Sequence, residues 1–261
     1  MSLMDEMKNV VNNGRELLST VSGKMKEIDE KIDGAVNDIT ATITANNVIN
    51  YYIDAENGDD ANTGTSNSPF KTLMRAISVS PSGSNVTINL KRSQRHICNG
   101  NTRCYAGVVY IQGWGRNTDQ TVNYYYDSTT PILQIEGQIT FNGSVFIGSY
   151  KNTIIVEANY TEGGGDPYFY FEGAAGKFTL ARSRVVLNNK TYRPFIGGEQ
   201  DYLTAVKVSL READISRDSG AFLTRRGCVI SADSVTGFSY VDEIVYGATK
   251  DSIVTDIPFS S

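Results

Sequence analysis

The sequence predicts a long amphipathic helix followed by a mainly β domain. Apolar residues recur at alternating spacings of three and four over residues 4–42, as they do in a coiled coil. Beyond residue 47 the chain holds many short β-prone runs separated by Gly, Asn, Asp and Ser. No repeated helical segment lies between these runs, which excludes a βαβ organisation and leaves a sandwich, a barrel or a solenoid.

Composition bounds the class of protein. The chain has 261 residues, 40% of them hydrophobic, with 24 Gly and only 6 Pro, as expected for a folded protein. The net charge of -5 and the absence of clustered Lys and Arg argue against a nucleic-acid partner. No apolar run approaches the roughly 20 residues that would span a bilayer, and no signal peptide is recognisable, so we expect synthesis in a cytoplasm and no membrane insertion. Nucleotide-binding and nucleophile motifs are absent, so no cofactor is expected.

The first segment has the heptad pattern of a coiled coil. Only Gly14 and Thr42 interrupt the apolar spacing. The register holds for more than the three or four heptads that make such an assignment reliable. Position a holds Met4, Val11, Leu18, Met25, Ile32 and Ile39, and position d holds Met7, Val21, Ile28 and Ala35.

The positions beside this stripe indicate how many chains associate. Apolar residues also occupy flanking positions and widen the stripe beyond what two strands would bury, which favours three. Lys24 at g and Asp29 at the following e are spaced to pair across a parallel interface. The alternative is a helix folded back on its own domain, but about 40 helical residues extend on the order of 60 Å. We therefore expect a parallel homotrimer. The flanking apolar residues are Leu3, Val10 and Leu17 at g, and Val36 and Ile43 at e.

The chain changes character after residue 46. A strand over 51–54 leads into Asn-Gly and Asn-Thr-Gly turns, and Ser68-Pro69 then begins a short helix with apolar residues at helical spacing. We therefore expect a coiled-coil segment at 1–46, an entry strand with turns and a capping helix at 47–79, and the β domain at 80–261.

The entry segment resembles that of phage tailspikes and other pectate-lyase-like proteins. The phrases that carry the resemblance are Tyr-Ile-Asp, Asn-Gly-Asp-Asp, Asn-Thr-Gly-Thr, Ser-Pro-Phe-Lys-Thr-Leu and Ala-Ile within residues 51–79. This resemblance implies a right-handed parallel β-helix over 80–261. It also implies that Phe70, Leu73 and Ile77 cover the first rung and protect its edge.

Two groups of acidic residues are candidates for chemistry. Glu136, Glu157 and Glu172 each follow three strand-favouring residues, and on aligned rungs they could form a column of carboxylates able to act as acid and base in glycoside hydrolysis. The alternative is that they mark exposed strand ends. The second group could bind a hard cation through oxygen ligands, although turn formation explains it equally well. It consists of Asp54, Glu56, Asp59 and Asp60.

The resemblance implies a role in a bacteriophage virion. We expect a structural or adhesive fibre that binds other virion proteins through its coiled coil and meets a host surface glycan or protein. The alternatives are a polysaccharide depolymerase and a head or collar decoration fibre. Residues 70–261 provide about eight rungs with no recognisable tip domain, which favours attachment or assembly over catalysis.

Overall fold

The computed structural model describes residues 2–46, 48–114, 127–149, 152–158, 168–172, 176–188, 194–198, 206–218, 221–225, 228–248, 250 and 254–260. The chain divides into two compact units, 1–47 and 48–261. Each unit is described by itself.

The first unit is a single helix, α1 (Leu3–Asn46), of 44 residues. Three glycines interrupt it, each disfavoured by about 1 kcal/mol relative to alanine in a helix interior. The Glu27 carboxylate accepts from Lys24 at 2.7 Å and from Lys31 at 2.9 Å, but exposed pairs of this kind contribute only about 0.5 kcal/mol each. A lone helix of this composition therefore gains little from within itself. In the described part of the chain, no helix is apolar enough over a sufficient length to cross a bilayer.

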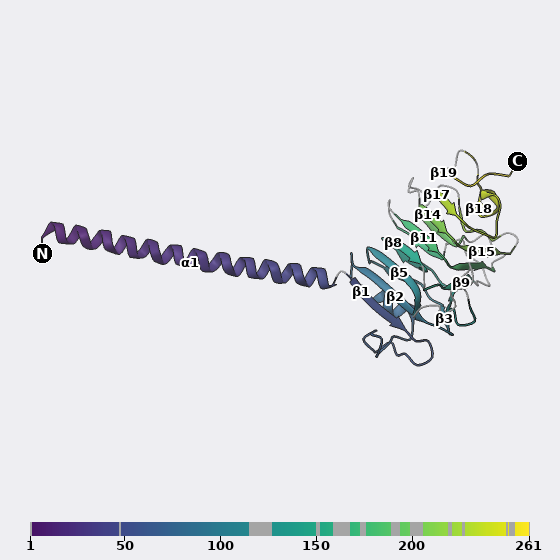
Figure 1. Ribbon diagram of the computed structural model, residues 1–261, viewed down its shortest axis with the longest axis horizontal. Helices are drawn as coiled ribbons and strands as arrows, with labels where there is room; N and C mark the ends of the chain where they lie inside the picture. Colours follow the sequence, from purple (N-terminus) through teal and green to yellow (C-terminus); the bar gives the residue numbers. More distant parts are fainter. Residues whose placement is uncertain are drawn as a thin grey trace. The chain divides into compact units, whose positions relative to one another are not determined.

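The second unit is a stack of parallel strands in three main sheets, in which every pair of strands within a sheet is parallel (Figure 1). The chain visits the three sheets in turn and then returns to the first sheet one rung further along, as in β2 (Asn85–Lys91), β3 (Arg95–Cys98), β4 (Thr102–Cys104) and β5 (Val108–Trp114). This arrangement is that of a parallel β-helix and confirms the predicted mainly β class with stacked strands.

The strand boundaries follow this order. Sheet 1 contains β1 (Val48–Ile53), β2 (Asn85–Lys91), β5 (Val108–Trp114), β8 (Ser144–Ile147), β11 (Lys177–Ala181), β14 (Val206–Arg211), β17 (Cys228–Asp233) and β19 (Val254–Thr255). Sheet 2 contains β3 (Arg95–Cys98), β6 (Ile132–Ile135), β9 (Ile155–Ala158), β12 (Arg184–Leu187) and β15 (Asp214–Arg217). Sheet 3 contains β4 (Thr102–Cys104), β7 (Ile139–Phe141), β10 (Phe169–Phe171) and β13 (Ile196–Gly198), and a separate pair contains β16 (Thr224–Arg225) and β18 (Val245–Tyr246).

The core consists of columns of like residues along the stack. Alternate side chains of a strand point to opposite faces, so each strand sends every second residue inward. Pairing then places inward residues of successive rungs directly above one another. One such column in sheet 1 is formed by Ile88, Ile111, Ile147, Leu180 and Leu210, all buried.

The corner between sheet 1 and sheet 2 repeats one backbone conformation. A single residue with positive φ turns the chain there, and its amide donates to a carbonyl of a neighbouring rung, as from Arg182 N to Arg211 O at 2.9 Å. Glycine adopts a positive φ readily, whereas other residue types do so only uncommonly. The corner residues are Ser93 (φ 62°), Gly148 (φ 74°), Arg182 (φ 47°), Glu212 (φ 46°) and Ser234 (φ 55°).

Both ends of the stack carry a cover. At the first rung, α2 (Leu73–Ser78) begins where the Thr72 hydroxyl accepts from Arg75 N, and it packs against β1, β3 and β4. At the last rung, the residues after β19 turn back along η1 (Val241–Glu243), where Ser260 N donates to Asp242 Oδ1 at 2.9 Å. Ile257, one of the residues after β19, is buried. Both covers remove apolar surface and unpaired strand edge from water.

Candidate functional site

The most extensive exposed apolar surface in the described part of the chain is a stripe along α1. Its side chains have exposed fractions between 47% and 70%, whereas soluble monomers rarely expose a large contiguous apolar patch. The stripe consists of Met4, Met7, Val11, Leu18, Val21, Met25, Ile28 and Ile32, which are the predicted a and d residues. The side chains of Ala35 and Ile39, the remaining predicted members, lie outside the described residues.

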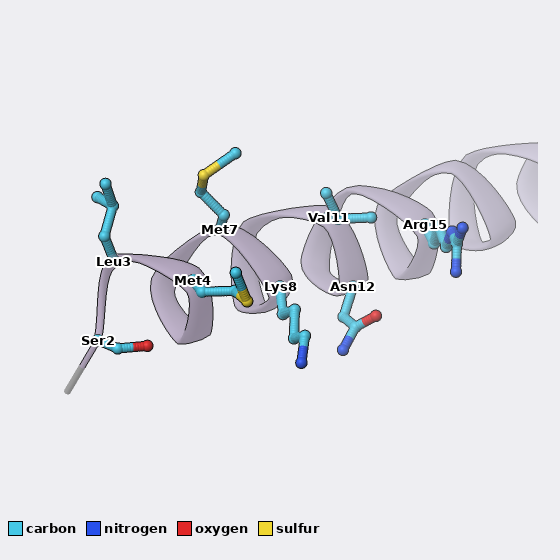
Figure 2. Close-up of a pocket in the computed structure, with 8 residues that line it drawn as sticks. All are labelled: Ser2, Leu3, Met4, Met7, Lys8, Val11, Asn12 and Arg15. Carbon is cyan, nitrogen blue, oxygen red and sulfur yellow. The ribbon is translucent and has the colours of Figure 1, made fainter.

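Figure 2 shows the first turns of this stripe. Leu3 and Met7 project from one side of the helix, Lys8 and Asn12 from the other, and Met4 lies between them. Together with Val11 and Arg15 they line a shallow, mainly apolar depression of about 770 Å³. This end of the helix therefore offers an apolar strip bordered on one side by basic and amide groups.

Charged residues along α1 differ in whether they already have partners. In the middle of the helix, Lys24 and Lys31 lie within 2.9 Å of Glu27, and Lys26 lies 3.8 Å from Glu30. Near the start, Lys8 and Arg15 make no ion pair within the described part of α1. Among the described side chains of α1, the basic groups near the start therefore differ from those in the middle of the helix.

Asp54, one of the predicted cation ligands, is instead the centre of a buried hydrogen-bond cluster. Its side chain is only 5% exposed; Oδ2 accepts from Lys91 Nζ at 2.5 Å, and Oδ1 accepts from Gln94 Nε2 at 2.9 Å. Burial acts to raise the pKa of Asp54, but the hydrogen bonds from Lys91, Gln94 and two backbone amides outweigh it and hold that pKa well below its usual range. The carboxylate therefore ties the entry turn to the first rung.

The other predicted cation ligands serve turns or face solvent. Asp59 Oδ1 accepts from Ala61 N at 2.9 Å, and Asp60 accepts from the amides of Lys71 and Thr72 at the start of α2. Glu56 is exposed. Within the described ranges no group of three or more His, Cys, Asp or Glu could hold a metal ion.

The three predicted catalytic glutamates do not form one column. Register pairs Glu157 in β9 with Gln134 and Val186, so Glu136 lies two residues further along its own strand path. Glu172 follows β10 in sheet 3, whereas the other two belong to sheet 2.

Each glutamate also has a nearby partner. Glu157 Oε2 lies 2.5 Å from Arg95 Nη1, Glu172 Oε1 lies 2.6 Å from Arg103 Nη2, and Glu136 Oε1 accepts from Gln134 Nε2 at 2.5 Å. The two ion pairs each link strands two rungs apart, and the three contacts do not assemble a pair of opposed carboxylates.

The predicted cap residues lie in the core. Phe70, Leu73 and Ile77 are each at most 2% exposed, and Phe70 forms a parallel bridge with Ile53 at the end of β1. The Phe70 ring also packs against Tyr51 with centroids 5.3 Å apart.

Sequence reasoning missed the partners that the first rung gives to Asp54. Lys91 and Gln94 lie more than 35 residues further along the chain, and only the pairing of β1 with β2 brings them close. It also missed His96, whose Nε2 donates to Lys91 O at 2.9 Å while its buried Nδ1 has no hydrogen-bond partner. Burial lowers the pKa of His96. Side chains alternate between exposed and buried along residues 95–98, and this pattern could have predicted that His96 is buried. No local pattern predicted the Asp54 cluster.

Comparison with known proteins adds one partial match. The model of a family described as a protein of unknown function (DUF1565) matches residues 56–164, which is less than half of the chain. The matched segment runs from the turns after β1 through α2 and the first rungs of the stack. Neither a search of curated proteins nor one of solved structures finds a match.

Proposed function

We propose that the protein is a structural or adhesive fibre of a bacteriophage virion, assembled as a parallel homotrimer through α1. The observation that carries the proposal is the exposed stripe of α1, because eight large apolar side chains at a and d positions need a partner surface. Three copies would bury the stripe and also part of the flanking Leu3 and Leu17. The β-helix then serves as the part that meets a host surface glycan or protein, or another fibre.

The virion setting rests on the resemblance of the entry segment to phage tailspikes. The parallel stack with a covered first rung supports that resemblance at the level of architecture. Separate placement of the three glutamates and the ion pairs of Glu157 and Glu172 favour attachment over the depolymerase alternative. A head or collar decoration fibre would share the same architecture, and a cryo-EM map of the particle distinguishes it from a tail fibre.

Oligomeric state tests the assembly directly. Light scattering on the full chain should give three times the chain mass of 28.6 kDa. Leu18→Cys at position a should form interchain disulfides under mild oxidation, because parallel in-register helices bring the same a residues together. Glu16→Cys, on the opposite side of the same turn, is the matched control and should not. A monomer mass would overturn the fibre proposal.

Activity is tested separately. Incubation with host surface polysaccharide should release no new reducing ends if the protein only attaches. Cleavage that is lost in Glu136→Gln, Glu157→Gln or Glu172→Gln would favour the depolymerase instead.

A further inference from the structure

The two flanks of the α1 stripe differ in chemistry along the helix, and the inference drawn from this rests on the proposed trimer. In a parallel coiled coil the g residue of one chain and the e residue of the next line the two walls of the outer groove between them. Near the N-terminus, g holds Leu3 and Leu17, which are 74% and 65% exposed. Position e holds Lys8 and Arg15. Each of the three grooves would therefore have one apolar wall and one basic wall.

Further along the helix, the two walls of the groove carry opposite charges. Lys24 at g faces Asp29 at e of the neighbour, so opposite charges meet there. Lys24 and Lys31 also have Glu27 within their own helix. Only the pairs Leu3 with Lys8 and Val10 with Arg15 combine an apolar g residue with a basic e residue, and the following e position holds Ser22, so this asymmetry is confined to residues 3–17.

Lys8 and Arg15 have no acidic residue opposite them across the groove in this register. They make no ion pair in the described part of α1, and the g residues that face them in this register are the apolar Leu3 and Val10. Figure 2 shows Lys8 on the side of the helix away from Leu3, consistent with their assignment to opposite flanks. Two basic side chains per chain and the apolar g residues that face them would therefore be open to a ligand from outside the trimer.

We propose that these grooves bind an acidic amphipathic helix, one in each groove, and that this is how the fibre docks to a partner protein. A helix in such a groove places apolar residues against Leu3 and Leu17 and carboxylates against Lys8 and Arg15. A membrane surface fits less well, because helices that lie on membranes are rich in Lys and Arg over their polar face. The polar face of this segment carries Glu6 and Glu16.

The test uses the full-length protein and a synthetic helical peptide of three heptads, with Leu at a and d and Glu on both flanks. Fluorescence anisotropy should show saturation at three peptides per trimer. Lys8→Glu combined with Arg15→Glu should weaken binding roughly tenfold or more, because attraction becomes repulsion at both sites. A peptide with Lys in place of Glu should then bind the double variant better than the parent. Leu3→Ser with Leu17→Ser should also weaken binding of the acidic peptide.

Controls separate failure of the groove from failure of the trimer. Lys71→Glu with Lys207→Glu makes the same charge change at two exposed positions of the second unit and should leave binding unchanged within about twofold. Light scattering is repeated on every variant and on the complex. A monomer mass for the parent overturns the trimer and the grooves together.

A trimer that ignores the acidic peptide, or that binds it equally after the charge reversal, overturns the groove alone. Binding to phosphatidylglycerol vesicles that depends on Lys8 and Arg15, without binding to the peptide, would assign the surface to a membrane and also overturn the proposal.

Discussion

Asp54 shows how a single buried carboxylate holds the entry turn to the first rung. Its hydrogen bonds come from a lysine and a glutamine of the first rung, and from the amides of Glu56 and Asn57 in the turn that follows β1. A charge this deeply buried costs free energy unless it is paired and fully hydrogen-bonded. These four donors meet that need, and so couple the local turn to the strand stack.

Asp54→Asn should lower the free energy of unfolding by about 2 kcal/mol at neutral pH, because hydrogen bonds to a charged group are lost or weakened. Chemical denaturation monitored by circular dichroism measures the change. Asp59→Asn, in an exposed turn of the same loop, is the matched control and should change stability by less than about 0.5 kcal/mol.

The free energy of unfolding of the parent protein should also depend on pH through Asp54. Its pKa is lower in the folded state than in the unfolded chain, so its stabilisation is complete above about pH 3.9 and is lost as the pH falls further. His96 has a lowered pKa as well, so the unfolded chain takes up its proton first and stability declines below about pH 6.5. Asp54→Asn should reduce the lower decline, part of which remains because Asp127 and Asp242 also have lowered pKa values, and should keep the upper one. A variant whose lower decline is as large as that of the parent would contradict the assignment.

At the scale of elements, the corner between sheets 1 and 2 depends on residues that accept positive φ. Gly148 leaves no room for a side chain: a Cβ there would lie 2.4 Å from the Ala181 carbonyl oxygen and 1.9 Å from Ser183 Oγ. Arg182 and Glu212 occupy the same corner on adjacent rungs, and their side chains form an ion pair at 2.6 Å. The corner thus combines a required backbone conformation with contacts between rungs.

Gly148→Ala should destabilise the β-helix by about 3 kcal/mol, since it adds left-handed strain to a clash with backbone. Gly83→Ala has the same φ of 74° but no atom within 4 Å of the added Cβ, so it should cost only about 1 kcal/mol. Urea denaturation of both variants compares them. Equal losses would mean that strain alone matters at the corner.

The helix α1 contains its own test of the coiled-coil register. Gly14 falls at d and Gly23 at f, and neither has an atom within 4 Å of an added Cβ in the single chain. Leucine at either position gains about 0.8 kcal/mol of helix propensity. Only Gly14→Leu would also bury a side chain between chains, worth about 2 kcal/mol more per chain.

Melting followed at 222 nm should therefore show a larger rise for Gly14→Leu than for Gly23→Leu, with a midpoint that depends on protein concentration. Equal rises without concentration dependence would favour a helix that does not associate.

At the scale of the whole molecule, the two units have separate sources of stability. The second unit has its own buried core, with α2 over the first rung and the segment after β19 over the last. Among the described side chains of the first unit, the apolar stripe is exposed and none is buried. Folding of the β-helix should therefore not require α1, whereas association should.

Deletion of residues 1–47 should give a monomer by light scattering whose β-sheet signal and melting temperature stay within a few degrees of the parent. The physical reason is that no core residue of the stack is removed. An unfolded or aggregated product would show that the β-helix needs its neighbours in the assembly, and a trimer would show that the stack itself associates.

The sequence by itself determined the elements with strong local signals. A heptad period over 4–42 specified α1, because one face of a helix repeats every 3.5 residues in a coiled coil. Short β-prone runs without intervening helices specified a mainly β domain. The short helix was also predicted, but its predicted start at Ser68-Pro69 was too early, because α2 begins at Leu73 after the Thr72 cap. Whether α1 trimerises stays a prediction, since one chain shows only the exposed stripe.

Only the tertiary structure decided which residues meet across rungs. Register placed Glu157 beside Gln134 and sent Glu172 to another sheet, and it brought Lys91 and Gln94 to Asp54. Rungs of this stack differ in length because loops of variable size connect the sheets, so sequence spacing does not reveal which positions align. Alignment is fixed instead by hydrogen bonding between parallel strands and by the inward columns that those strands must pack.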